Sequence, residues 1–254
     1  MAKMTNEKSR RLILTGNIWQ VVIAITMPLF FYQLINSFYS LIDQIMVAQI
    51  GESSVSAVAT LTQIKGCIMA IGTGLSGGWT IIVARLYGAG KIEEAKKNAN
   101  VIFTIALITS TIILLLFLPF STFVLRLCQV PDDLITISDL YFKLQIIEQV
   151  IIIFNNIFIG LEKSKGNTKI IFILNIIIMG VKLILNSIFI YGFHVTNLAW
   201  IEVASIVAQL VLFVIAMIKL FSKDNIFKIS FKTLSLKWNY LKKNITSFTT
   251  IIFR

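Results

Sequence analysis

The sequence is poor in charged residues. Only 14% of its 254 residues are Asp, Glu, Lys or Arg, whereas 57% are hydrophobic and the mean hydropathy is +0.85. A soluble domain of this size carries charges on about a quarter of its residues. The composition therefore excludes an ordinary soluble domain and predicts an integral membrane protein.

The chain also has few of the residues that enzymes use. It contains two cysteines, Cys67 and Cys128, and one histidine, His194, whose spacing resembles no metal site. No Ser/His/Asp, Cys/His or paired-carboxylate grouping indicates catalysis. We therefore expect neither an enzyme nor a protein with a bound cofactor.

Long apolar stretches dominate the chain instead. Crossing a bilayer as a helix takes roughly 20 residues. Six stretches are long enough, and they cover residues 21–49, 55–87, 101–123, 138–161, 169–191 and 197–221. The sequence thus predicts an all-α fold with six transmembrane helices.

Acidic residues are scarce, with 12 Asp and Glu against 23 Lys and Arg, for a net charge of +11. In a soluble protein this balance would suggest nucleic-acid binding. Here nineteen of the 23 basic residues precede the first stretch or follow the second, fourth and sixth, while the opposite connections hold only Arg126 and Lys143. By the positive-inside rule, both ends of the chain are predicted to be cytoplasmic. Topology accounts for the basic balance, and no nucleic-acid partner is expected.

One glycine-rich motif imitates a nucleotide-binding fingerprint. GTGLSG, residues 72–77, matches G-x-G-x-x-G, but it lies inside an apolar stretch and lacks the strand that the fingerprint requires. Glycines in such a stretch let neighbouring membrane helices approach closely. We therefore interpret the motif as a helix-packing seam.

Several segments together resemble one family of transporters. MPLFFYQLINSFYSLIDQIMVAQIG carries Pro28, Tyr39, Asp43 and Gly51 in the order and spacing of the first helix of the multidrug and toxic compound extrusion (MATE) family. AIGTGLSGGWTIIVARLYGAG resembles the second helix of that family, VPDDLITISDLYFKL the entry to the fourth, and KSKGNTK the loop between the fourth and fifth. The resemblance extends over residues 20–222.

The resemblance implies one lobe of a larger transporter. Members of the family have two six-helix lobes, related by a parallel pseudo-repeat, around a central cavity. Residues 21–222 would form the first lobe of this twelve-helix arrangement and residues 1–20 a cytoplasmic N-terminal tail. Residues 223–254 would form a basic cytoplasmic linker and the aborted start of a seventh helix. On this interpretation the chain is a truncated or frame-shifted product, or else a half-size protein that dimerises.

Asp43 is a carboxylate within the first apolar stretch. Ionised groups are costly inside a membrane and normally face the bundle interior or a wet cavity. Counting along the helices from their outer ends places Asp43, Asn186 and Ser205 at a similar depth. Their oxygens suit a proton or a hard cation such as Na⁺. The alternative is that Asp43 makes only a structural hydrogen bond.

The resemblance implies an ion-coupling and substrate-binding site at the same place. In many members the first-helix Asp joins an Asn and an Asp, four residues apart on the fifth helix, and a Thr on the sixth. Lys182 and Asn186 stand at the Asn and Asp positions, and Ser205 stands at the Thr position. The first two replacements depart from the chemistry of the family.

Lys182 changes what such a site can do, because its charge repels Na⁺ and favours an ionised Asp43. Glu202 offers Lys182 a partner, in which case the two residues form an ion pair between the fifth and sixth stretches. Alternatively, Lys182 pairs with Asp43 directly. The expected site comprises Asn36, Tyr39, Asp43, Lys182, Asn186, Glu202 and Ser205.

Two more charged residues, Lys65 and Glu148, lie within apolar stretches. They either line a cavity, snorkel to the membrane surface or lie between helices, and the sequence does not decide among these arrangements.

The resemblance implies a cation-coupled antiporter that uses H⁺ or Na⁺ to export small organic, often cationic, compounds across a bacterial cytoplasmic membrane. This chain would be its N-terminal half. Its partners would be those compounds, the lipid bilayer, and a second lobe or a second copy of the chain. The alternatives are an inactive fragment or interaction protein of the membrane, and a lipid-linked oligosaccharide flippase of the same superfamily.

Overall fold

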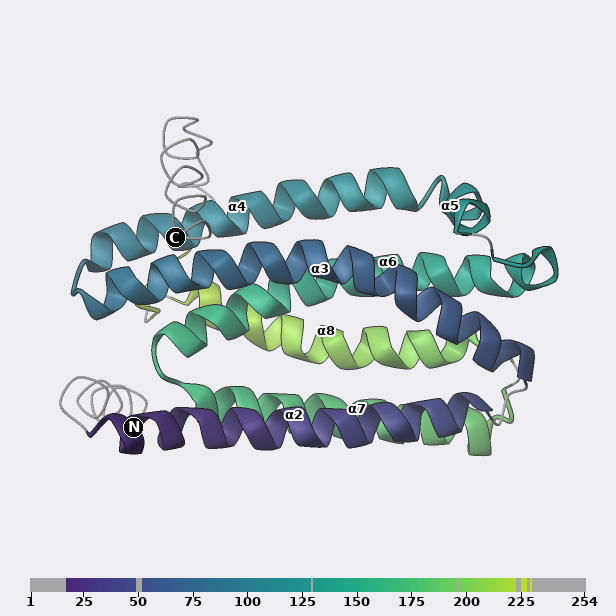
Figure 1. Ribbon diagram of the computed structural model, residues 1–254, viewed down its shortest axis with the longest axis horizontal. Coiled ribbons are helices and arrows are strands. Elements are labelled where there is room, and N and C mark those ends of the chain that lie inside the picture. Colours follow the sequence, from purple (N-terminus) through teal and green to yellow (C-terminus); the bar gives the residue numbers. More distant parts are fainter. Residues whose placement is uncertain are drawn as a thin grey trace.

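The structure is a computed structural model that describes residues 17–48, 52–128, 130–195, 197–222, 225–227 and 229 (Figure 1). Most of the expected N-terminal tail and of the expected linker lies outside these residues. The described part is helical and contains no strand. The predicted all-α fold is therefore confirmed for the described residues.

Long helices run side by side along the longest axis of the molecule (Figure 1). They are α2 (Ile18–Ala48), α3 (Glu52–Gly88), α4 (Ile92–Phe117), α6 (Asp132–Ser164), α7 (Thr168–Ser187) and α8 (Ala199–Phe221). A short helix, α5 (Ser121–Leu127), links α4 to α6, and one π-helical turn, η1 (Ile188–Gly192), extends α7.

Five of the described helices are long and apolar enough to cross a membrane. These segments are Val55–Gly88, Ile92–Phe117, Leu134–Ser164, Thr168–Gly192 and Ala199–Phe221. The counterpart of the first expected stretch, α2, has 31 residues but is not among these five. Five of the six predicted spans are thus matched, and a sixth crossing by α2 stays a prediction.

The third and fourth spans begin earlier than the hydropathy predicted. Helix α4 begins at Ile92 rather than near residue 101, with Glu93 and Glu94 in its first turn, where negative charge interacts favourably with the helix dipole. It ends at Phe117, shortly before Pro119, because proline has no backbone N–H and cannot continue the hydrogen-bond ladder. The last residues of the third expected stretch therefore belong to α5. Helix α6 likewise begins at Asp132, six residues before the expected start.

Close packing of α3 against α6 depends on two glycines. A Cβ added at Gly72 would lie 2.7 Å from Cγ1 of Ile153, and one added at Gly160 would collide with the side chain of Thr80. Gly74 and Gly77 have no such neighbour within 4 Å among the residues that the structure describes. The predicted packing role of the GTGLSG motif is confirmed at Gly72 and stays a prediction at the other two positions.

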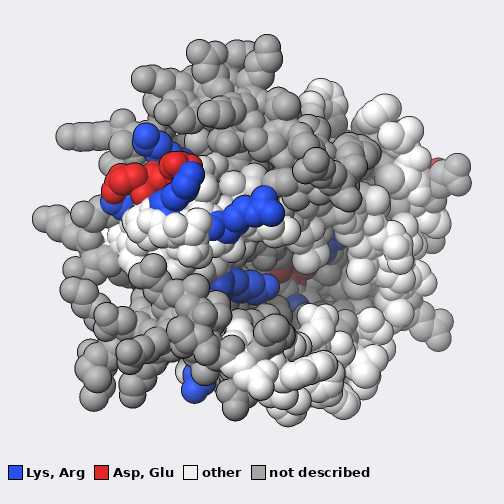
Figure 2. All heavy atoms as spheres, turned by 60° about the vertical axis from the view of Figure 1, so that its left-hand side comes forward, with Lys and Arg blue, Asp and Glu red and all other residues white. Residues whose placement is uncertain are grey.

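Basic side chains gather at one end of the molecule. The turns from α3 to α4 and from α6 to α7 lie at the left of Figure 1, together with the end of α8. Figure 2 brings this end forward and shows Lys and Arg side chains on it, beside some Asp and Glu. The described basic residues of these segments are Arg85, Lys91, Lys96, Lys97, Lys163, Lys165, Lys169 and Lys219. Their shared end matches the alternation seen in the sequence, and a cytoplasmic location of this end stays a prediction.

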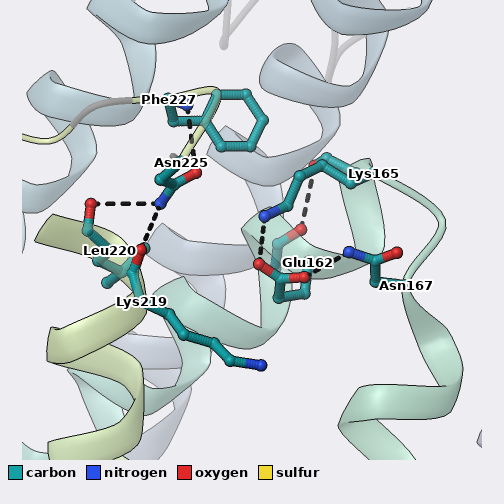
Figure 3. A network of polar contacts seen from close by, with 9 residues as sticks. Glu162, Lys165, Asn167, Lys219, Leu220, Asn225 and Phe227 are labelled. Atoms are coloured by element: carbon teal, nitrogen blue, oxygen red, sulfur yellow. Dashed lines mark hydrogen bonds and ion pairs between the residues drawn. The ribbon is translucent and has the colours of Figure 1, made fainter. Parts of the chain in front are cut away.

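A polar network holds the turn from α6 to α7 at this basic end (Figure 3). Glu162 pairs with Lys165, and its Oε2 accepts a hydrogen bond of 2.7 Å from Nδ2 of Asn167. Both side chains of the ion pair are buried, at 5% and 8% exposure. The carboxylate of Glu162 is therefore satisfied on both of its oxygens.

The segment that follows α8 packs back onto this turn (Figure 3). Asn225 donates hydrogen bonds of 3.0 and 3.2 Å to the carbonyl oxygens of Lys219 and Leu220. Its Oδ1 accepts a hydrogen bond from the backbone N–H of Phe227. The Phe227 ring is fully buried, and its centroid lies 5.7 Å from the Lys165 ammonium, within the range of a cation–π contact. Phe227 thereby anchors this segment.

Candidate functional site

The residues expected to form the site are distributed over three neighbouring helices. Asn36, Tyr39 and Asp43 lie on α2, but their side chains are outside the described part of the structure. Lys182 and Asn186 lie on α7, and Glu202 and Ser205 lie on α8. Helix α7 packs against both α2 and α8. The fold thus brings these three helices together, while a common site made of their side chains stays a prediction.

Two uncharged members of the expected site are buried inside the lobe. Asn186 is fully buried and Ser205 is 2% exposed. The Ser205 hydroxyl donates a hydrogen bond of 3.1 Å to the carbonyl oxygen of Ile201, one turn earlier on α8. Both side chains therefore face protein rather than lipid, as polar side chains of membrane helices usually do.

The charged residues converge on a cluster that the sequence did not reveal. Lys65 on α3 pairs with Glu148 on α6, and its Nζ also lies 3.7 Å from Oε1 of Glu202 on α8. The side chains are 24%, 5% and 2% exposed, respectively. We call Lys65, Glu148 and Glu202 the charge cluster. It joins three helices that are distant in sequence.

The two acids of the charge cluster approach the same ammonium group. Lys65 pairs with the carboxyl group of Glu148, and its Nζ lies 3.7 Å from Oε1 of Glu202. Oε1 of Glu202 is buried and accepts no hydrogen bond from the described residues. The cluster thus contains two buried carboxyl groups around one ammonium group.

Helix α6, which carries Glu148, is the most buried of the candidate spans. Buried polar residues recur along it at helical spacing, so that Gln145, Glu148, Gln149 and Asn155 form a stripe turned away from lipid. Asn155 donates hydrogen bonds to the carbonyl oxygen and the Oε1 of Gln209 on α8, at 3.1 and 2.9 Å. The stripe therefore attaches α6 to α8 as well as carrying Glu148.

Lys182 brings a further positive charge to the charge cluster from a fourth helix. It lies on α7, within electrostatic range of Lys65, Glu148 and Glu202. From the sequence, Glu202 was a predicted partner of Lys182. In the structure, the cation that lies within 4 Å of Glu202 is Lys65 instead. The reason is geometric, since the fold brings Lys65 of α3 to Glu202 of α8.

Lys65 and Glu148 were visible in the sequence as charged residues within apolar stretches, but their arrangement was left open. The signal that could have joined them was their opposite charge at comparable depth in two spans, since an unpaired charge in a membrane is rarely tolerated. Of the three arrangements left open, the structure shows the one between helices.

Comparison with known proteins places this lobe in a family. The MatE family model matches residues 28–188, which is more than half of the chain. The chain belongs to the MatE family. The match covers most of α2 and all of α3, α4, α5, α6 and α7, and it includes Lys65, Glu148 and Lys182.

Solved transporters share the fold of this MatE lobe. The chain is similar to a multidrug resistance MATE family transporter of the MOP superfamily in its outward-facing conformation, with a TM-score of 0.79 and 23% identity over 87% of the chain. It is also similar to a MOP superfamily transporter from Pyrococcus furiosus, described as having a binding pocket of reverse polarity that suggests a different function. That match has a TM-score of 0.83 and 24% identity over 92% of the chain. The chain spans 49% and 52% of these two structures, or about half of each.

A curated relative gives a shorter match. The probable multidrug resistance protein NorM of Buchnera aphidicola is 28% identical over 96 residues, which are 38% of this chain and 21% of that protein. The resemblance read from the sequence motifs is thus confirmed at the level of family and fold, and the half-length coverage agrees with a single lobe.

Proposed function

We propose that this MatE chain is the N-terminal lobe of a cation-coupled antiporter, which exchanges H⁺ or Na⁺ for small organic, often cationic, compounds. Membership of the family and a fold shared with multidrug resistance transporters support the transport class. The observation that carries the coupling is the group of ionisable residues held inside the lobe. Buried ionisable groups in a membrane protein are costly, and they mark ion and substrate pathways.

Alternating access requires a second bundle. In transporters built from repeats, one repeat or bundle moves against the other around a central site. The chain spans about half of the matched transporters, so the proposed partner is a second six-helix lobe or a second copy of this chain. We propose that the assembly lies in the cytoplasmic membrane with the basic end of the lobe in the cytoplasm.

Growth of a drug-hypersensitive bacterium on a panel of cationic dyes tests this function. The chain alone should give no resistance, because it supplies only half of the cavity walls. The chain joined to a second MatE lobe should restore growth. Robust resistance from the chain alone would indicate that a second copy of the chain takes the place of the second lobe. Failure of every joined form would refute the proposed export.

A further inference from the structure

We propose that Glu148 and Glu202 hold one proton between them and form a proton-binding site of the lobe, from which Lys65 and Lys182 exclude Na⁺. The role of this site in coupling rests on the proposed function, whereas the presence of the proton does not.

The geometry of the two acids carries the proposal. Both carboxyl groups lie within 4 Å of the Nζ atom of Lys65, and their residues are only 4% and 2% exposed. Two carboxylates that share a buried site repel, and the usual result is that one of them stays neutral.

The contacts of Lys65 indicate which acid carries the proton. Lys65 pairs directly with Glu148, whereas its Nζ stays 3.7 Å from Glu202 Oε1, beyond hydrogen-bond distance. An ionised carboxylate takes the closer contact with an ammonium group, because the charge-assisted hydrogen bond is the stronger one. Glu148 is thus the ionised member and Glu202 the proton carrier. The buried Glu202 Oε1, which accepts no hydrogen bond from the described residues, fits a neutral acid.

The surroundings favour a proton over a metal cation. A bound Na⁺ requires several oxygen ligands, whereas this pair is approached by the ammonium groups of Lys65 on α3 and Lys182 on α7. Two positive charges in electrostatic range repel a further cation.

The remaining charged groups near these helices pair with other residues or lie near the ends of their helices. Lys143 pairs with Asp139 near the start of α6. The charged residues of α4 lie in its first two turns, and Arg126 lies in the last turn of α5. On α2, the Asp43 side chain is outside the described part.

The fold also stabilises Glu202 after it has released the proton. Glu202 lies in the first turn of α8, where the helix dipole favours negative charge. Once ionised, Glu202 repels Glu148 and attracts Lys65 and Lys182. Since these groups lie on α3, α6, α7 and α8, loss of one proton changes the forces between four helices.

Infrared difference spectroscopy on the 254-residue chain in lipid nanodiscs tests the proton directly. At neutral pH we expect the carbonyl band of a protonated carboxylic acid, which disappears on alkalinisation. Labelling the glutamates with ¹³C should shift this band, and an unshifted band would overturn the proposal because the acid would then not be a glutamate. This measurement needs no variant, so it holds even where a substitution prevents folding.

Three matched variants assign the band. Glu202→Gln and Glu148→Gln should each abolish it, because either change leaves a single carboxyl group beside Lys65. Glu162→Gln should keep it, because Glu162 is equally buried but pairs with Lys165 and Asn167 and has no second acid. A band that survives both cluster variants, or that vanishes in Glu162→Gln as well, would overturn the assignment. Displacement of the band by NaCl at constant pH would overturn the exclusion of Na⁺.

The infrared measurement does not depend on transport. Loss of export with an intact proton band would refute the proposed function alone, and export without the band would refute the proton site alone.

Discussion

Replacing Lys65 by methionine is the sharpest perturbation of the charge cluster. The change keeps the length of the aliphatic side chain and removes the ammonium group that contacts Glu148. Removing one partner of a buried ion pair leaves an uncompensated charge and costs about 3–5 kcal/mol. The Lys65 side chain is 24% exposed, and its two acids are 5% and 2% exposed, so water relieves little of this cost. We expect the free energy of unfolding to fall by about 3 kcal/mol.

The same chain offers an exposed ion pair as a control. Lys143 pairs with Asp139 one turn away on α6, and these side chains are 40% and 24% exposed. Exposed pairs contribute about 0–1 kcal/mol, so Lys143→Met should cost no more than that.

A double variant separates the charge from the packing. Lys65→Met combined with Glu148→Gln removes both members of the direct ion pair and leaves no orphaned charge from it. We expect it to recover about 2 kcal/mol of the single-variant loss, as a coupling energy between contacting residues. Reversible unfolding in mixed detergent micelles measures all of these variants. The reasoning is refuted if Lys65→Met costs no more than Lys143→Met, or if the double variant is as unstable as the sum of the single ones.

Three further predictions concern packing and topology. Gly160→Ala should lower the free energy of unfolding by about 1–2 kcal/mol, because overpacking against α3 exceeds the gain in helix propensity. Gly180→Ala, which has open space around it, should raise the free energy of unfolding by up to about 1 kcal/mol. Phe227→Ala should cost about 3–5 kcal/mol and speed tryptic cleavage beyond α8; unchanged cleavage would contradict the anchoring role. In a cysteine-free background, Glu94→Cys should resist an impermeant thiol reagent in intact cells while Asp132→Cys, at the opposite end, reacts; the reverse pattern would invert the topology.

The fold could be read from the sequence because hydropathy and charge report directly on a bilayer. Apolar length located five of the six spans, and the alternation of basic residues predicted that their connections share one end. The errors arose where other forces set helix limits. Helix α4 extends nine residues into polar sequence before residue 101, and Pro119 divides the third stretch into two helices.

The charge cluster could not be read from the sequence for a different reason. Glu202 was paired with Lys182 because both lay in adjacent spans, and adjacency in sequence was the available guide. The structure places Lys65, 137 positions before Glu202, closer to it, since α3 packs along α6 and α6 along α8. Contacts among non-consecutive helices depend on their crossing positions, which periodicity within each helix does not specify.

We propose that this lobe couples transport to a cation, with Asp43 on α2 as the expected coupling residue. The most direct measurement is dye–cation exchange in proteoliposomes that contain the chain joined to a second MatE lobe, driven by an imposed proton or sodium gradient. Asp43→Asn should abolish the exchange while the protein stays folded and inserted. Undiminished exchange by Asp43→Asn, at the rate of the unsubstituted protein and under the same gradient, would contradict it.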